Sequence, residues 1–181
     1  ATELKDKLPD GVYPFACPVD FQTWYYQTVY ANGGWILNDD ATETGYGDAK
    51  TQEGIQCWID MIDAGLSPSA STLSETGSDA MFEGEQIAMT LAGSYMVPEY
   101  ASNDTIKDKI DCVEVPTFNG VEDNCINGLG FAVYEGSKQK EEAEKFAIWM
   151  GSSEAQKIQG ETGVVISARE DAQQYFAKAN E

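Results

Sequence analysis

The sequence contains no histidine among its 181 residues, and this absence removes the commonest catalytic groups. A Ser/His/Asp triad or a Cys/His pair needs an imidazole as its general base, so neither arrangement is available. The phosphate-binding loops GxGxxG and GxxxxGK[ST] are also missing. We therefore expect no cofactor, and binding is a better hypothesis than catalysis.

Positive charge is scarce. Eleven Lys and Arg face 31 Asp and Glu, which gives a formal net charge of -20. Such a field repels phosphate backbones and anionic lipid headgroups, so no nucleic acid partner is expected. The acidity is typical of a solvated surface, and it leaves neutral or cationic ligands open. No apolar run approaches the ~20 residues that span a bilayer, and residues 1–5 carry no signal-peptide pattern.

The four cysteines have no CxxC spacing, and without histidine they cannot build a Cys/His zinc site. No metal site is expected. Cys112 and Cys125 flank an apparent reversal of the chain. They form either a disulfide or two free thiols, and both alternatives stay open.

Short strand-like segments alternate with helical ones along the chain. Hydrophobic residues make up 42% of the sequence, and a chain of this length buries roughly 70% of its unfolded surface. Alternation or short apolar runs predict strands at 12–17, 86–91, 112–115 and 130–134. Because helical patterns separate them, the order predicts an α/β fold.

Two helices have clear start and stop signals. Asp20 is the predicted cap of an aromatic-rich helix over 21–30, which the glycines after Asn32 end. Asp48 is the predicted cap of a second helix that ends at Gly65. In that helix an apolar stripe at helical spacing places Trp58 in the core.

Other segments give weaker signals. Residues 67–78 are rich in Ser, Thr, Pro and Gly and predict a loop, and one helical turn follows at 79–83. A short helix is expected after Pro98. Ser137 is the predicted cap of an apolar helix, and Ser153 opens another.

Aromatic residues stand beside glycines and expected strand ends. Examples are Phe21 and Trp24 after a proline, Trp35 after two glycines, and Tyr95 after Gly93. Open α/β sheets bind ligands in the crevice beyond the strand ends. A ring in that place offers a flat apolar face to a pyranose, although most rings of any protein fill its core.

Residues Phe82 to Tyr95 resemble the Phe…Gly…Ala-Met…Gly-x-Trp motif of extracellular solute-binding proteins of bacterial ABC sugar importers (family 1, maltodextrin-binding-protein-like). Tyr95 replaces the usual Trp. Three more stretches resemble the same family in the same order, and together they extend the resemblance over nearly the whole chain: 30–34, 113–120, and 127–133 followed by 142–146.

The resemblance implies a fold and a domain organisation. It implies a periplasmic-binding-protein-like type II lobe with a mixed sheet flanked by helices. Residues 1–127 correspond to the second, C-terminal lobe of a two-lobed clamp, 128–166 to a crossover strand and helices that pack on the first lobe, and 167–181 to a return segment whose last helices are missing or truncated. On this interpretation the chain is a fragment, and 128–166 either repack on 1–127 or self-associate.

The resemblance also implies a site. Tyr95 stacks on the sugar, while Gly93 and Ser94 bring the backbone near it. The strand-to-helix turn supplies a polar and an aromatic contact, and other expected ligand-binding residues lie near the hinge and after the crossover: Asp20, Phe21, Trp24, Asn127, Gly128 and Arg169.

The resulting hypothesis is a non-catalytic carbohydrate-binding lobe that works by stacking, hydrogen bonds and lobe closure. The implied partners are an oligosaccharide and the membrane subunits of an ABC permease, and the implied location is extracytoplasmic, as a surface lipoprotein or in the periplasm. A polyamine or other cationic solute is the nearest alternative, since carboxylates and rings bind cations. A carbohydrate-active enzyme, with two acids beside the rings, or a protein interaction module are remoter alternatives.

Overall fold

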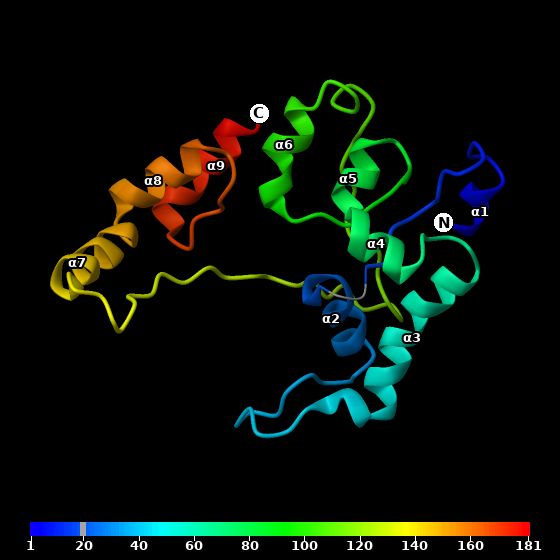
Figure 1. Ribbon diagram of the computed structural model, residues 1–181, viewed down its shortest axis with the longest axis horizontal. Helices are drawn as coiled ribbons and strands as arrows, with labels where there is room; N and C mark the ends of the chain where they lie inside the picture. Colours follow the sequence, from blue (N-terminus) through cyan, green and yellow to red (C-terminus); the bar gives the residue numbers. More distant parts are fainter. Residues whose placement is uncertain (19–20) are drawn as a thin grey trace. The chain divides into compact units, whose positions relative to one another are not determined.

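The structure is a computed structural model that describes residues 1–18 and 21–181, and most of its regular structure is helical (Figure 1). The α-helices are α1 (Thr2–Lys5), α2 (Gln22–Ala31), α3 (Ala49–Asp63), α4 (Ala70–Thr76), α5 (Ser78–Glu83), α6 (Val97–Ser102), α7 (Lys140–Met150), α8 (Ser153–Glu161) and α9 (Gln173–Ala179). The described residues also form the short 3₁₀ helices η1 (Gly45–Gly47), η2 (Ser94–Met96) and η3 (Glu170–Ala172).

The chain forms two compact units. Unit 1 comprises Ala1–Leu91 and Asp108–Asn127, and unit 2 comprises Ala92–Lys107 and Gly128–Glu181. Unit 1 therefore contains α1 to α5, and unit 2 contains α6 to α9.

Helices α2 and α3 pack together in unit 1, as Figure 1 shows. Gly54 allows the close approach, because a Cβ atom at this position would lie 2.8 Å from the Thr28 carbonyl oxygen and 2.8 Å from the Val29 Cα. The Trp58 ring lies inside the unit, 7% exposed, and stacks on Phe15 at a centroid distance of 6.0 Å. The predicted core position of Trp58 is confirmed.

The start of α3 and the ends of α2 and α3 agree with the sequence. The Asp48 carboxylate accepts the Lys50 and Thr51 backbone N–H groups at 2.9 and 3.2 Å, as expected of an N-cap. Gly33 and Gly65 have φ of +75° and +66°, the left-handed conformation that glycine adopts after a helix. The predicted cap Asp20 lies outside the described residues, and Phe21 occupies the N-cap position of α2.

Two predicted strands of unit 1 meet without forming a sheet. The Tyr13 N–H donates to the Gln86 carbonyl and the Ala88 N–H donates to the Tyr13 carbonyl, both at 2.9 Å. This is a single parallel bridge between Tyr13 and Ile87. On the other side, the Phe15 N–H donates to the Leu66 carbonyl at 3.0 Å. Within 1–18 and 21–181 the mixed sheet implied by the resemblance is reduced to such isolated contacts.

The small core of unit 1 lies around this bridge and contains Ala16, Leu73, Met81 and Ile87, each at most 5% exposed. Leu73 belongs to α4, where the sequence predicted a loop. That prediction is wrong because Ser69 caps the helix, its hydroxyl accepting the Thr72 N–H at 3.1 Å. The predicted helical turn before Gly84 is confirmed as α5.

Residues 112–115 and 130–134 are extended but do not pair. Apart from the Ser137 N–H, which donates to the Tyr134 carbonyl at 3.0 Å in a turn, no backbone hydrogen bond joins either segment to another part of the described chain. A strand becomes regular only when a neighbour accepts its N–H and C=O groups. Between Cys112 and Cys125 the chain reverses in a turn at Phe118 and Val121. The Phe118 N–H donates to the Val121 carbonyl at 3.0 Å, and the Val121 N–H donates to the Phe118 carbonyl at 2.9 Å. Cys112 and Cys125 are free thiols.

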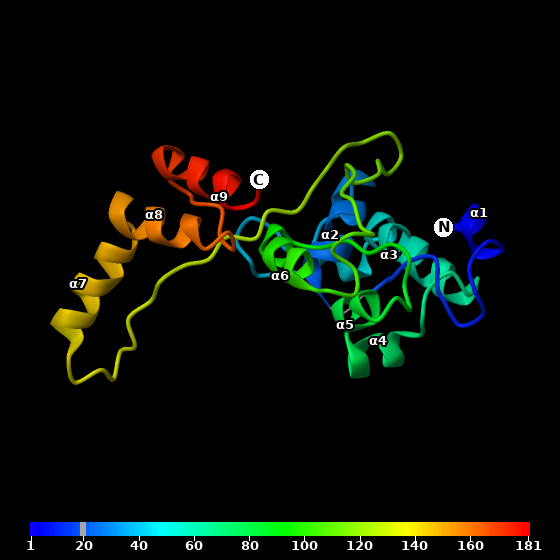
Figure 2. The same ribbon diagram turned by 90° about the horizontal axis from the view of Figure 1, so that it is seen from above.

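Unit 2 is built on α8 and α9, which lie side by side (Figure 2). Gly160 permits their contact, since a Cβ there would lie 2.9 Å from the Tyr175 Cβ. Helix α8 begins at Ser153, as predicted. The predicted cap of α7 is wrong, because Gln139 takes that position and the Ser137 hydroxyl only accepts the Gln139 N–H at 3.2 Å. The predicted short helix after Pro98 is α6, in which Pro98 stands in the first turn.

Candidate ligand-binding site

Tyr95 lies in η2 with its ring folded across Gly93. A Cβ added to Gly93 would lie 2.2 Å from the Tyr95 Cε1 and 2.6 Å from its Cδ1, so no larger residue fits under the ring. Gly93 has φ −74° and ψ 153°, angles that any residue adopts. Glycine is therefore required here by the ring and not by the backbone. The Tyr95 side chain keeps 49% of its surface exposed.

The neighbouring residues of this turn differ in their exposure to solvent. Ser94 is exposed beside the ring. The Met96 N–H donates to the Gly93 carbonyl at 2.9 Å, which closes the turn, and Met96 itself is 7% exposed. The turn therefore combines a buried side chain, Met96, with an exposed ring, Tyr95.

The Arg169 side chain forms an ion pair with Asp171, two residues further along the chain. Its Nε and Nη2 donate to the two Asp171 carboxylate oxygens at 3.0 and 3.1 Å, and the Ser153 hydroxyl donates to the same carboxylate at 2.7 Å. The guanidinium and Ser153 lower the pKa of Asp171, and Asp171 raises the pKa of Arg169. A ligand that uses this guanidinium therefore has to compete with an exposed ion pair.

The remaining predicted residues lie mostly in unit 1. The Trp24 indole is 7% exposed and offers no open face, whereas Phe21 is half-buried at the N-cap of α2. Asp20 lies outside the described residues. Asn127 ends the second segment of unit 1 and Gly128 begins the second segment of unit 2, and both are exposed.

The predicted residues thus divide between the units. Phe21, Trp24 and Asn127 belong to unit 1, and the rest of the described set belongs to unit 2: Gly93, Ser94, Tyr95, Gly128 and Arg169. Among the described residues, the structure brings the Tyr95 ring close to Gly93.

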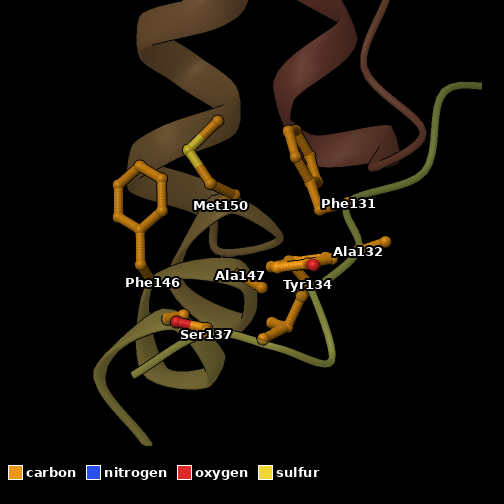
Figure 3. A pocket seen from close by; sticks show the side chains of 9 residues that line it. Phe131, Ala132, Tyr134, Ser137, Phe146, Ala147 and Met150 are labelled. Carbon is orange, nitrogen blue, oxygen red and sulfur yellow. The ribbon is translucent and has the colours of Figure 1, made fainter. Parts of the chain in front are cut away.

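A pocket of about 250 Å³ in unit 2 was not predicted (Figure 3). It lies between residues 131–134 and helix α7, and Figure 3 shows the Phe131 and Tyr134 rings on one wall and Phe146 and Met150 on the other. Apart from the hydroxyl groups of Tyr134 and Ser137, its lining side chains are apolar. The α7 spacing of apolar residues indicated one wall, but the other wall comes from a segment that was expected to be a sheet strand.

A second unpredicted pocket, of about 260 Å³, lies in unit 1 and is here called the tyrosine pocket. It is lined by Tyr26, Gln27 and Tyr30 of α2 and by residues 123–126. Burial, followed by a hydrogen bond with Tyr46, raises the pKa of Tyr26. The spacing of Tyr26 and Tyr30 by one helical turn was visible in the sequence, but the approach of residues 123–126 was not.

Three solved structures share this fold. An ABC substrate-binding protein from Listeria monocytogenes, solved in complex with cycloalternan, is 24% identical with a TM-score of 0.72, covering 94% of this chain and 44% of that chain. The GacH receptor of Streptomyces glaucescens, solved unliganded and with acarbose and an acarbose homolog, is 19% identical with a TM-score of 0.70, covering 99% and 49%. UspC of M. tuberculosis is 19% identical with a TM-score of 0.64, covering 92% and 41%.

The chain belongs to the bacterial extracellular solute-binding protein family, whose profile matches residues 1–157. Proteins of this family are substrate-binding receptors and not enzymes. No curated protein sequence matches the chain. The chain spans less than half the length of each of the three solved structures.

The family description places such proteins outside the cytoplasm. Among the helices of the described residues, none has the length and apolar character needed to cross a bilayer.

Proposed function

We propose that this chain is the carbohydrate-binding second lobe of an ABC importer's solute receptor, and that Tyr95 is its stacking platform. The observation that carries the proposal is the Tyr95 ring, held over Gly93 and still 49% exposed. A ring in this position presents its exposed face to a pyranose. The tyrosine hydroxyl adds a hydrogen-bonding group that the usual tryptophan lacks at this point.

The related structures support the ligand class. Two of the three were solved with carbohydrate ligands, cycloalternan and acarbose. A cationic solute has no comparable support, so the polyamine alternative is not carried further.

The lobe assignment is part of the proposal. Residues 1–127 would form the second lobe, 128–166 the crossover and its helices, and 167–181 the return segment of a longer protein. The parallel bridge between Tyr13 and Ile87 supports a mixed sheet at this place once its other strands are present. Ser94, Phe21, Trp24, Asp20, Asn127, Gly128 and Arg169 are secondary candidates for ligand contact.

The mechanism follows from binding by two lobes. Ligand contacts made only in the closed form shift the clamp toward closure, because a ligand favours the state that it binds better. The closed receptor would then dock on the membrane subunits of the permease. An extracytoplasmic location, with or without a lipid anchor, is the setting that this function requires.

Titration calorimetry of the full-length protein with oligosaccharides that include acarbose and cycloalternan tests the proposal. Tyr95→Ala should weaken binding by about 1–3 kcal/mol, roughly 5- to 150-fold in Kd, because stacking and apolar burial are both lost. Tyr95→Trp should retain most of the affinity. Gly93→Ala should weaken binding too, since the new Cβ displaces the ring.

Tyr134→Ala is the matched control, because this tyrosine is 79% exposed and lies outside the predicted site. Equal losses for Tyr95→Ala and Tyr95→Trp would contradict the stacking role. Binding of no oligosaccharide at all would overturn the function.

A further inference from the structure

The tyrosine pocket lies entirely within unit 1, whereas the Tyr95 turn belongs to unit 2. One wall is a face of α2, where Tyr26 and Tyr30 are four residues apart and lie on the same side of the helix. The other wall is the chain of residues 123–126 just before the end of the unit at Asn127. Its shape therefore does not depend on how the two units sit.

The aromatic wall is held in a fixed geometry. The Tyr25 and Tyr26 rings meet edge to face at 5.1 Å, and the Tyr26 and Tyr30 rings do so at 6.2 Å. The Tyr25 hydroxyl is 2.8 Å from the Tyr46 hydroxyl, which anchors this row of rings to the segment before α3. Two perpendicular rings make a corner, in which a ligand ring can lie on one face and touch the other edge. The Tyr30 side chain is 48% exposed.

The opposite wall supplies polar groups of both kinds. Asn124 Oδ1 accepts the Cys125 N–H at 2.8 Å, which leaves the Asn124 amide N–H groups available as donors. Asp123 makes no ion pair or hydrogen bond within the described part of the chain, so its carboxylate oxygens are available as acceptors. Cys125 and Ile126 add apolar surface to the same wall of the pocket.

The pocket volume of about 260 Å³ is below the ~300–1,000 Å³ that drug-sized ligands occupy. It suits one ring of a larger molecule. We propose that the tyrosine pocket is a second carbohydrate subsite, which holds a single pyranose ring between the Tyr26–Tyr30 corner and the Asp123–Asn124 wall. The choice of ligand class rests on the proposed function of the chain.

The polar groups distinguish a sugar from an organic cation. Each sugar hydroxyl both donates and accepts, and so it uses the Asp123 carboxylate and the Asn124 amide N–H together. A cation uses the carboxylate and the ring faces, but it makes no use of the amide donor. Both kinds of group line this pocket, which favours the sugar.

Cys125 makes the test direct, because it lines the pocket while the free thiol of Cys112 lies outside it. The 181-residue chain is alkylated with iodoacetamide, and the rate at each cysteine is followed by tandem mass spectrometry. With acarbose at ten times its Kd, the rate at Cys125 should fall about tenfold, since only the unoccupied protein reacts. The rate at Cys112 should not change.

Tyr30→Ala and Asp123→Ala should each abolish the protection of Cys125, and both side chains are exposed enough to be truncated without unfolding. Tyr134→Ala in unit 2 is the matched control and should retain it. Acarbose binding by calorimetry without protection of Cys125 would overturn the subsite and leave the proposed function standing.

Failure of acarbose both to bind and to protect would overturn the subsite in this chain, and the separate titration of the full-length protein would then decide the function. Protection by spermidine but not by acarbose would overturn the carbohydrate assignment of the pocket.

Discussion

The hydroxyl of Thr28, in helix α2, makes three contacts, and two of them are with helix α3. The hydroxyl oxygen accepts a hydrogen bond from the Trp58 indole N–H at 2.8 Å. The hydroxyl also donates to the Gly54 carbonyl oxygen at 2.7 Å and to the Tyr25 carbonyl oxygen at 2.9 Å. One hydroxyl hydrogen serves both carbonyls, whereas the indole N–H depends on this oxygen alone. Thr28 is 6% exposed and Trp58 is 7% exposed, so water does not readily replace the hydroxyl.

The expected effect of Thr28→Val follows from that difference. Valine keeps the shape of the side chain and leaves a buried indole N–H without a partner, which costs about 1–3 kcal/mol of unfolding free energy. In a Trp58→Phe background the ring has no N–H, and the same substitution should cost only about 0.5–1.5 kcal/mol for the lost donor bond. The two substitutions should therefore be coupled.

Urea unfolding of the four members of this double-mutant cycle measures the coupling. A Trp149→Phe background removes the one tryptophan of unit 2, so that the remaining indoles report on unit 1 alone. The midpoint and the slope of each transition give the free energy of unfolding. Residues in contact show interaction energies of about 0.5–3 kcal/mol, and independent sites add within about 0.3–0.5 kcal/mol.

Additive losses in the cycle would refute the reasoning. They would mean that the indole N–H finds another partner, or that Thr28→Val acts through packing alone. Thr28→Ser, which retains the oxygen, should preserve the coupling with Trp58 and so separates these explanations.

Two further predictions concern the packing of unit 1. Gly54→Ala should lower the midpoint of urea unfolding, because its Cβ would lie 2.8 Å from backbone atoms of α2. This clash should outweigh the ~1 kcal/mol by which alanine favours a helix over glycine. Gly47→Ala is the control and should not lower the midpoint, because a Cβ at Gly47 would have no neighbour within 4 Å. Burial raises the pKa of Cys17 to about 12, so iodoacetamide at pH 8 should modify the exposed Cys112 well before it. Because the pKa of Cys17 is higher in the folded protein, its contribution to stability is complete below the unfolded value near 9 and is lost as pH rises toward 12. Urea midpoints measured over this pH range should therefore fall more in the unmodified protein than in Cys17→Ala, which has no thiol to ionise.

Local signals predicted the helices well. Asp48 and Gly65 bracket α3 because a cap and a left-handed glycine act within a few residues of themselves. The same kind of signal was missed at α4, where Ser69 is a cap inside a stretch whose composition indicated a loop. At α7 the sequence predicted Ser137 as the cap, whereas Gln139 occupies the N-cap position in the structure.

The strands were less predictable because their partners are far away in sequence. Residues 12–17 find one bridge with 86–91, while 112–115 and 130–134 find none in the described chain. An alternating pattern indicates that a segment can be a strand, but only a neighbour makes it one.

The candidate site shows the same division. The sequence by itself determined that the protein has no histidine chemistry and carries many more acidic than basic residues. It also determined the resemblance to a family of solute receptors, in which the Gly93-Ser94-Tyr95 stretch is part of the matching motif. Only the tertiary structure decided that Gly93 is needed by the ring and not by the backbone, that Trp24 is buried, and that residues 123–126 meet Tyr26 and Tyr30. Composition and caps act locally, whereas pockets depend on contacts between distant segments, which a linear pattern does not specify.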